Sequence, residues 1–234
     1  MVDYFSEAGE HHNYDINNNQ DVIVHKYNGK YTVISLADGI SECKKAISGA
    51  NTACVSSSEF LLKYADDLFS MNENEIANRI ISNLQCKLMK LSEKESVPFE
   101  EYSSTLSCVL IENRTGRMYF FSVGDCLILG CGNEKIKVLA MPSDSRNGCF
   151  ATTTYKAAEY SKSGFDNVKD LNSVFICSDG AWRIMYDRNR IKKEFKNVML
   201  DQNNSDLKKM LHSSKRYDDC SFISLYLKRV SKGE

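Results

Sequence analysis

The order of hydrophobic periodicities along the chain constrains its fold more than any other feature. Residues 21–27 and 31–37 are typical of β-strands, and Asn28-Gly29 between them is a hairpin signal. After Asp38-Gly39 the period changes to steps of three and four residues, which predicts a long helix over residues 46–68. Asn72 opens a second predicted helix, and its buried stripe comprises Ile76, Ile80, Leu84, Leu88 and Leu91.

Strand patterns return after Pro98 and continue to the end of the chain. We expect strands over residues 106–111, 118–123, 127–129, 136–139, 172–177 and 221–227, with helical patterning at residues 191–198 and 207–211. Strands therefore stand at both ends and in the middle, around two blocks of paired helices. This order excludes a regular strand-helix alternation, and it favours an α+β fold of mostly antiparallel sheets with helix pairs packed outside. We see no linker or internal repeat, so we expect a single domain over residues 1–234.

Composition excludes several classes of partner. Thirty basic residues stand against 31 acidic ones, and a net charge of −1 predicts no general attraction to nucleic acid or to an anionic membrane. No apolar run approaches the roughly 20 residues of a membrane span, and the N-terminal segment lacks the layout of a signal peptide. The nine cysteines are odd in number and scattered, without any C-x-x-C pair. This pattern favours reduced thiols in the core of a cytoplasmic protein.

A group of aspartates shares one local setting, at the edge of an apolar strand beside a small, polar or turn-forming residue. They are Asp21, Asp38, Asp125, Asp179 and Asp218. A single Asp-Gly after a strand is ordinarily only a turn. If the five strands pair, however, these carboxylates converge at one end of a sheet.

Carboxylates that lie close together repel one another, and this repulsion indicates which kind of ligand the site binds. Two carboxylates about 4 Å apart repel each other by roughly 4 kcal/mol at an effective dielectric constant near 20, so such a cluster needs a cation. The chain has no clustered His or Cys ligands, and oxygen ligands alone indicate Mg²⁺ or Mn²⁺. Two such ions can share a bridging water, lower its pKa and present hydroxide to phosphorus. The pattern therefore favours metal-assisted hydrolysis of a phosphoester.

The motifs around these aspartates, in their order, resemble those of the PP2C-type (PPM) metal-dependent serine/threonine protein phosphatases. The resemblance extends from about Tyr4 to about Leu227, and the segment around His12 is similar to the compact bacterial branch of the family. The matching motifs are Asn19-Gln20-Asp21, Leu36-Ala37-Asp38-Gly39, Ser103-Ser104-Thr105-Leu106, Ser122-Val123-Gly124-Asp125, Cys177-Ser178-Asp179-Gly180 and Asp218-Asp219-Cys220-Ser221.

The resemblance implies a four-layer α-β-β-α sandwich and an activity, the hydrolysis of phosphoserine and phosphothreonine in proteins that are kinase targets. It implies two Mn²⁺ or Mg²⁺ ions, with Asp38 bridging both and the Gly39 carbonyl binding one. Asp21, Asp179 and Asp218 would complete the ligand set, and Asp125 would hold a third, weaker ion. Thr105 and Ser221 would support these ligands. Neither the preferred metal nor the oligomeric state follows from the sequence.

The chain departs from the family pattern at three places. Ile16 stands where an arginine usually binds the substrate phosphate, and His12 is our candidate for a substitute. Gln20 replaces a common glutamate, and residues 40–43 replace a glycine-rich stretch, which alters the loop above the predicted metals. Residues 143–169 match a variable flap in position, either a substrate-selecting loop or an inert surface loop.

These departures leave two alternatives to a protein phosphatase. One is a catalytically weak or inactive relative that binds phosphoproteins, although the retained aspartates argue against it. The other is a phosphoesterase for small molecules on the same fold. Trp182 likewise has two interpretations, as a packing anchor for the helix after Asp179 or as a platform for substrate.

Overall fold

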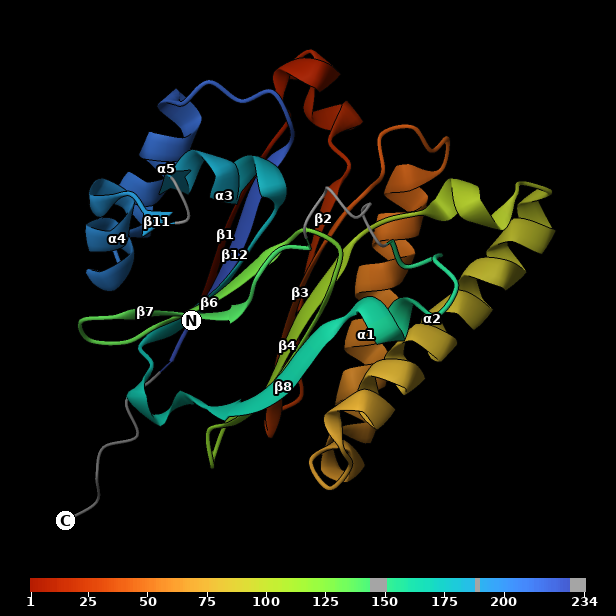
Figure 1. Ribbon diagram of the computed structural model, residues 1–234, viewed down its shortest axis with the longest axis horizontal. Coiled ribbons are helices and arrows are strands. Elements are labelled where there is room, and N and C mark those ends of the chain that lie inside the picture. Colours follow the sequence, from red (N-terminus) through yellow and green to blue (C-terminus); the bar gives the residue numbers. More distant parts are fainter. Residues whose placement is uncertain (144–150, 188–189, 228–234) are drawn as a thin grey trace.

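The computed structural model describes residues 1–143, 151–187 and 190–227, and it shows two five-stranded sheets stacked face to face. Helices cover the outer face of each sheet (Figure 1). All strand pairs in the two sheets are antiparallel. The predicted α-β-β-α sandwich is therefore confirmed.

The first sheet carries the long helix pair. Its strands, in spatial order, are β2 (Asp21–Tyr27), β3 (Tyr31–Asp38), β4 (Leu106–Glu112), β5 (Arg117–Val123) and β8 (Lys162–Asn167). Helices α1 (Ala46–Leu68) and α2 (Glu73–Glu95) lie on its outer face. The Asn72 side chain accepts a hydrogen bond from the Glu75 backbone N–H, so α2 begins at the residue predicted from its capping signal.

The second sheet joins the two ends of the chain. Its strands, in spatial order, are β1 (Val2–Glu7), β12 (Cys220–Tyr226), β9 (Ser173–Cys177), β6 (Leu127–Cys131) and β7 (Ile136–Ala140). Its outer face carries α3 (Asp179–Met185), α4 (Lys193–Leu200) and α5 (Asn204–Ser213). A two-stranded ribbon of β10 (Tyr186–Asp187) and β11 (Arg190–Ile191) separates α3 from α4.

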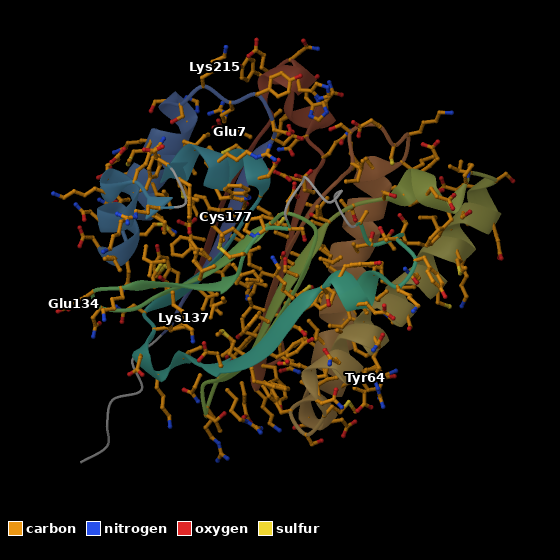
Figure 2. All side chains as sticks on the ribbon, in the orientation of Figure 1. Glu7, Tyr64, Glu134, Lys137, Cys177 and Lys215 are labelled. Carbon is orange, nitrogen blue, oxygen red and sulfur yellow. The ribbon has the colours of Figure 1, made fainter. Side chains whose placement is uncertain are left out.

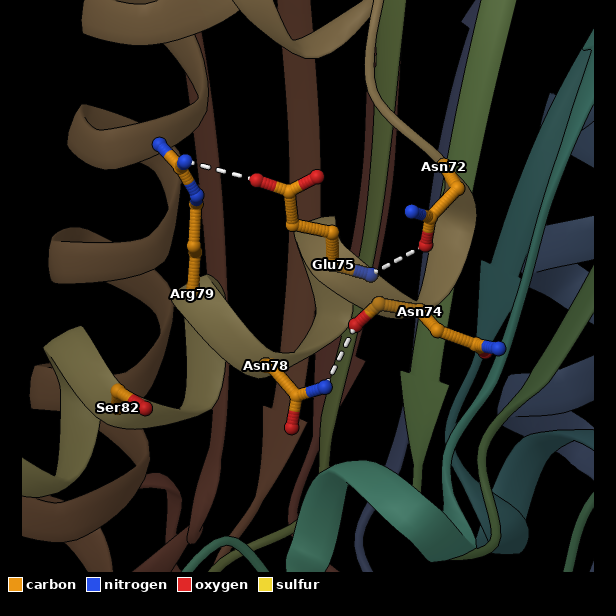
Figure 3. A pocket seen from close by; sticks show the side chains of 6 residues that line it. All are labelled: Asn72, Asn74, Glu75, Asn78, Arg79 and Ser82. Carbon is orange, nitrogen blue, oxygen red and sulfur yellow. Dashed lines mark hydrogen bonds and ion pairs between the residues drawn. The ribbon is translucent and has the colours of Figure 1, made fainter.

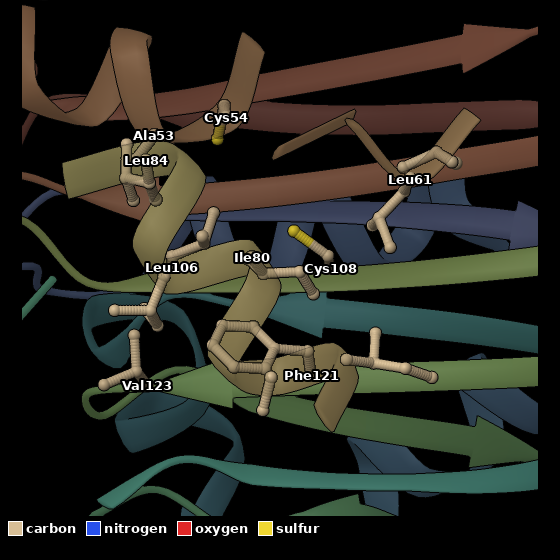
Figure 4. Packing of buried hydrophobic residues seen from close by; sticks show 14 of the residues in the cluster. Ala53, Cys54, Leu61, Ile80, Leu84, Leu106, Cys108, Phe121 and Val123 are labelled. Carbon is tan, nitrogen blue, oxygen red and sulfur yellow. The ribbon is translucent and has the colours of Figure 1, made fainter. Parts of the chain in front are cut away.

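Buried apolar side chains form three layers that follow from this architecture. Between α1, α2 and the first sheet lie residues such as Leu61, Ile80 and Phe121 (Figure 4). A second layer fills the space between the two sheets, and a third lies under α3, α4 and α5. Figure 2 shows Cys177 in the interior beside this third layer, whereas Glu134 and Lys215 lie at the periphery. Truncating one such buried aliphatic side chain to alanine costs about 2 to 5 kcal/mol, so these layers fix how the two sheets sit on each other.

The structure also contains elements that the sequence patterns did not predict. Strand β1 was missed, and β8 lies within the segment interpreted as a variable flap. Residue Ile191, which was assigned to helical patterning, instead ends the short β10–β11 ribbon. Part of the predicted flap, residues 144–150, lies outside the described residues.

Two further findings concern membrane-spanning helices and the cysteines. No helix within the described ranges is long and apolar enough to cross a membrane. Each of the cysteines in these ranges is a free thiol.

Candidate functional site

The first two predicted site residues face each other across a strand pair. Asp21 begins β2 and Asp38 ends β3, and their Cα atoms are direct antiparallel partners. Side chains at such positions have Cβ atoms about 5 Å apart. Thr105 holds Asp38 from the neighbouring strand: its hydroxyl accepts from the Asp38 N–H at 2.9 Å, and its own N–H donates to the Asp38 carbonyl at 2.7 Å.

The second sheet supplies Asp179 and Asp218 at the same end of the sandwich. Strand β9 ends at Cys177 beside Phe222 of β12, and the Ser178 N–H donates to the Ser221 carbonyl at 2.9 Å. Asp179 follows this junction and Asp218 precedes it. Gly180 permits the close approach, because a Cβ atom there would lie 2.2 Å from the Asp219 carbonyl oxygen.

The structure places the other four predicted aspartates near enough to Asp38 for their charges to affect its pKa. Burial raises the pKa of Asp38 well above its usual value, and the negative charges of Asp21, Asp179, Asp125 and Asp218 raise it further. Burial also raises the pKa of Asp21 well above its usual value, with contributions from Asp219 and Asp179. The pKa of Asp179 is raised to about 7, first by burial and then by Asp125. Such shifts arise where carboxylates crowd together away from water.

Several oxygens of this cluster are buried without a hydrogen-bond donor. They are both carboxylate oxygens of Asp21 and Oδ1 of Asp179. The hydroxyls of Ser178 and Ser221 offset part of the rise in the Asp21 pKa, but both donate elsewhere, to backbone carbonyls and to the Ser6 hydroxyl respectively. A buried acceptor without a donor costs about 1 to 3 kcal/mol.

These orphaned oxygens fit a divalent cation, since oxygen-rich carboxylate sites suit Mg²⁺ and Mn²⁺. The side chains do not form a closed cage by themselves: no three Asp, Glu, His or Cys side chains of the described chain converge as a ready ligand group. Gly39, the other predicted ligand, is buried directly after Asp38, and its N–H donates to the Gln20 carbonyl at 3.2 Å.

Asp125 lies at the outer side of the cluster, after β5. Gly124 precedes it with a φ of +100°, and a Cβ atom at Gly124 would lie 2.6 Å from a Thr105 methyl carbon. The Trp182 indole N–H donates to the Asp125 carbonyl at 2.8 Å. Trp182 therefore ties helix α3 to the Asp125 backbone, as the packing-anchor interpretation requires.

Asp219 is a site residue that the sequence analysis missed. Its carboxylate accepts hydrogen bonds from the N–H groups of Gly9 at 3.0 Å and Gln20 at 2.7 Å, and it contacts His12 Nδ1 at 2.9 Å. One side of the His12 ring is thus committed to Asp219, and its role in binding phosphate stays a prediction. The Asp218-Asp219 pair in the sequence was the available signal.

Arg183 is the second missed residue. Its guanidinium Nη1 lies 2.6 Å from Asp179 Oδ2, and its Nη2 lies 3.9 Å from Asp125 Oδ2. Arg183 follows Asp179 by four residues, the spacing at which side chains meet on a helix. This spacing could have revealed the contact once a helix was placed at Asp179.

Two surface hollows differ in their relation to the acidic cluster. One of about 410 Å³ begins beside Asp21 and is lined by Gln20 and by residues of the loop and first turns of α1, including Lys44 and Asn51. The other lies at the start of α2, around Asn72 and Arg79 (Figure 3). Its polar groups bond to one another, as in the Arg79–Glu75 ion pair at 2.8 Å, and it contains none of the predicted site residues.

Acidic residues gather at one end of both sheets of the sandwich, and comparison with known proteins identifies the family. The family model described as Protein phosphatase 2C matches residues 8–213. The chain therefore belongs to the protein phosphatase 2C family.

Solved structures agree with this assignment at the level of the fold. The chain is similar to a bacterial serine phosphatase, with a TM-score of 0.73 and 15% identity over 97% of this chain and 98% of that one. It is also similar to the serine/threonine phosphatase Stp1 from Staphylococcus aureus, with a TM-score of 0.69 and 14% identity over 97% and 95% of the two chains. RsbX, solved in complex with magnesium, gives a TM-score of 0.62 and 14% identity over 97% and 94%. No curated protein matches the chain by sequence.

Proposed function

We propose that this chain hydrolyses phosphoserine and phosphothreonine in proteins with the help of two divalent ions, Mn²⁺ or Mg²⁺. The observation that carries this proposal is the set of buried carboxylate oxygens without donors on Asp21 and Asp179, beside Asp38. Family membership supports the phosphatase activity. The magnesium bound to the similar RsbX supports the choice of a hard cation.

The residues that would hold the ions come from both sheets. Asp21, Asp38 and the Gly39 carbonyl would be contributed by the first sheet, and Asp179 and Asp218 would be contributed from the β9–β12 end of the second. When bound, the ions supply an activated water and neutralise the charge on the phosphoryl group.

The chain's own contribution is to orient these ligands before ions and substrate arrive. Thr105 fixes Asp38 through two hydrogen bonds to its backbone. Asp219 likewise orients the start of β2, because its carboxylate accepts a hydrogen bond from the Gln20 N–H and so fixes the backbone directly before Asp21. Such preorganisation lowers the cost of assembling the charged site.

The substrate phosphate has fewer cationic partners than the family pattern provides. Ile16 is 59% exposed, and its side chain cannot bind a phosphate. The hollow that begins at Gln20 carries Lys44, an exposed cation. Ile16 favours the second candidate function, a catalytically weak relative that binds phosphoproteins.

Phosphate release tests the proposal directly. We expect the wild-type chain to hydrolyse a phosphothreonine peptide and p-nitrophenyl phosphate when Mn²⁺ is present, and EDTA to abolish both reactions. Asp38→Asn should lower kcat at least about 100-fold, because Asp38 faces Asp21 at the centre of the cluster. Asp201→Asn is the matched control, since Asp201 is exposed at the end of α4.

The outcomes separate the candidate functions. Turnover that survives in Asp38→Asn would reject the proposed chemistry. A wild-type chain that binds the phosphopeptide in the presence of Mn²⁺ without releasing phosphate would instead identify the binding module. Turnover of p-nitrophenyl phosphate but not of phosphopeptides would indicate the small-molecule phosphoesterase.

A further inference from the structure

A positively charged side chain already lies within the acidic cluster. The Arg183 guanidinium contacts Asp179 at 2.6 Å and approaches Asp125 to 3.9 Å. Among the residues that the structure describes, no other Lys or Arg forms an ion pair with any of the five predicted site aspartates. Arg183 therefore neutralises the outer two carboxylates, and the inner ones are left without a cation.

Local contacts hold Arg183 in this position. It lies four residues after Asp179 on the same helix, so the ion pair is built into the turn of α3. Its guanidinium carbon lies 5.6 Å from the centre of the Trp182 ring, within the range of a cation–π contact. The Trp182 indole in turn donates to the Asp125 carbonyl. The same short helix thus positions the cation and both of its acidic partners.

The two oxygens of Asp179 have different environments. Oδ2 contacts Arg183, whereas Oδ1 is buried without a donor. An ion that used Oδ2 of Asp179 together with Asp125 would have to displace the guanidinium, because Nη1 already lies at hydrogen-bonding distance from that oxygen. An ion that used Oδ1 would leave Arg183 in place.

We propose that Arg183 is a built-in cation that occupies the outer pair Asp125–Asp179, so that this chain takes up two divalent ions instead of three. The inference rests on the proposed function for the inner pair of ions. It replaces our expectation of a third, weaker ion at Asp125.

Counting bound ions tests this proposal without any use of activity. Free Mn²⁺ measured by electron paramagnetic resonance during titration should give two ions per wild-type chain. Arg183→Gln removes the charge and keeps much of the side chain, and it should raise the number to three. Arg183→Lys keeps a positive charge and should return the number to two. Arg183→Gln combined with Asp125→Asn should also return it to two, because one ligand of the outer ion is then lost.

A control variant outside the acidic cluster shows whether loss of any arginine ion pair changes the number of bound ions. Arg79→Gln breaks a comparable Arg–Glu pair on α2, with a 2.8 Å contact outside the cluster, and should leave two ions bound. Circular dichroism should show that each variant is folded. Three ions on the wild-type chain, or two on a folded Arg183→Gln chain, would overturn the proposed role of Arg183 and would leave the proposed function standing. A wild-type chain that binds no Mn²⁺ would reject the proposed function, and this inference with it.

Discussion

Replacing Asp21 by asparagine should stabilise the metal-free protein while it removes the response to metal. Asp21 is 9% exposed, its two carboxylate oxygens have no donor, and it lies directly opposite Asp38. Asparagine has nearly the same shape, and it removes one of two facing negative charges. The substitution therefore changes the electrostatic contribution of the cluster to the free energy of unfolding and leaves its packing contribution nearly unchanged.

The magnitude follows from the strand geometry. At a separation of about 5 Å and an effective dielectric constant near 20, two unit charges repel by about 3 kcal/mol. Partial protonation of the cluster, indicated by the raised pKa values of Asp21 and Asp38, reduces the repulsion that is felt at neutral pH. We therefore expect Asp21→Asn to raise the free energy of unfolding in EDTA by about 1 to 3 kcal/mol. For a chain of this size that corresponds to an increase in Tm of about 3 to 10 °C.

Thermal unfolding with EDTA and with excess Mn²⁺ measures both effects. The wild-type chain should gain about 3 kcal/mol for each bound ion at a free Mn²⁺ concentration 100 times that site's dissociation constant, and Asp21→Asn should gain much less. The order of the two Tm values should therefore reverse between the two conditions. Asp201→Asn should follow the wild type in both. A lower Tm for Asp21→Asn in EDTA, or an equal gain from Mn²⁺, would refute the reasoning.

Two further predictions concern pH and backbone approach. Because the pKa of Asp179 is raised to about 7 in the folded chain from 3.8, the folded state holds a proton that the unfolded state has released between these values. The metal-free protein should therefore lose stability as the pH rises from 5.5 to about 7, and denaturant unfolding in EDTA that shows a gain over this range would contradict the assignment. Gly180→Ala should destabilise the chain by about 1 to 3 kcal/mol and lower phosphatase activity at least tenfold, since its Cβ would lie 2.2 Å from the Asp219 carbonyl oxygen. Gly29→Ala is the control, because Gly29 lies in the β2–β3 turn and a Cβ atom there would meet no atom within 4 Å. This variant should lose some stability, since Gly29 has a φ of +89°, but it should keep its activity. Equal activity losses in the two variants would argue against a specific effect at the site.

Local patterns were sufficient to predict mostly antiparallel sheets with helix pairs outside, whereas the four-layer sandwich followed from the resemblance to the PP2C family. Hydrophobic alternation located the central strands, and the position of each aspartate at a strand end placed it at an edge of a sheet. Convergence then required only that the strands pair, which the Asp21–Asp38 register shows most directly.

The parts that were missed depend on polar edge strands and on contacts between distant segments. Strand β8 is an edge strand with the sequence KSGFDN, in which a buried face is hard to recognise. Strand β1 alternates only weakly and gains its place by pairing with β12 at the other end of the chain. The contact of His12 with Asp219 likewise joins residues 207 positions apart, and no local pattern encodes it.

The most direct measurement of the central claim is a crystal structure of the wild-type chain grown with Mn²⁺, with anomalous diffraction recorded at the manganese edge. We expect two anomalous peaks among Asp21, Asp38, Asp179 and Asp218, with Arg183 still beside Asp179. Anomalous peaks only elsewhere on the molecule, or none in crystals of protein saturated with Mn²⁺, would contradict it.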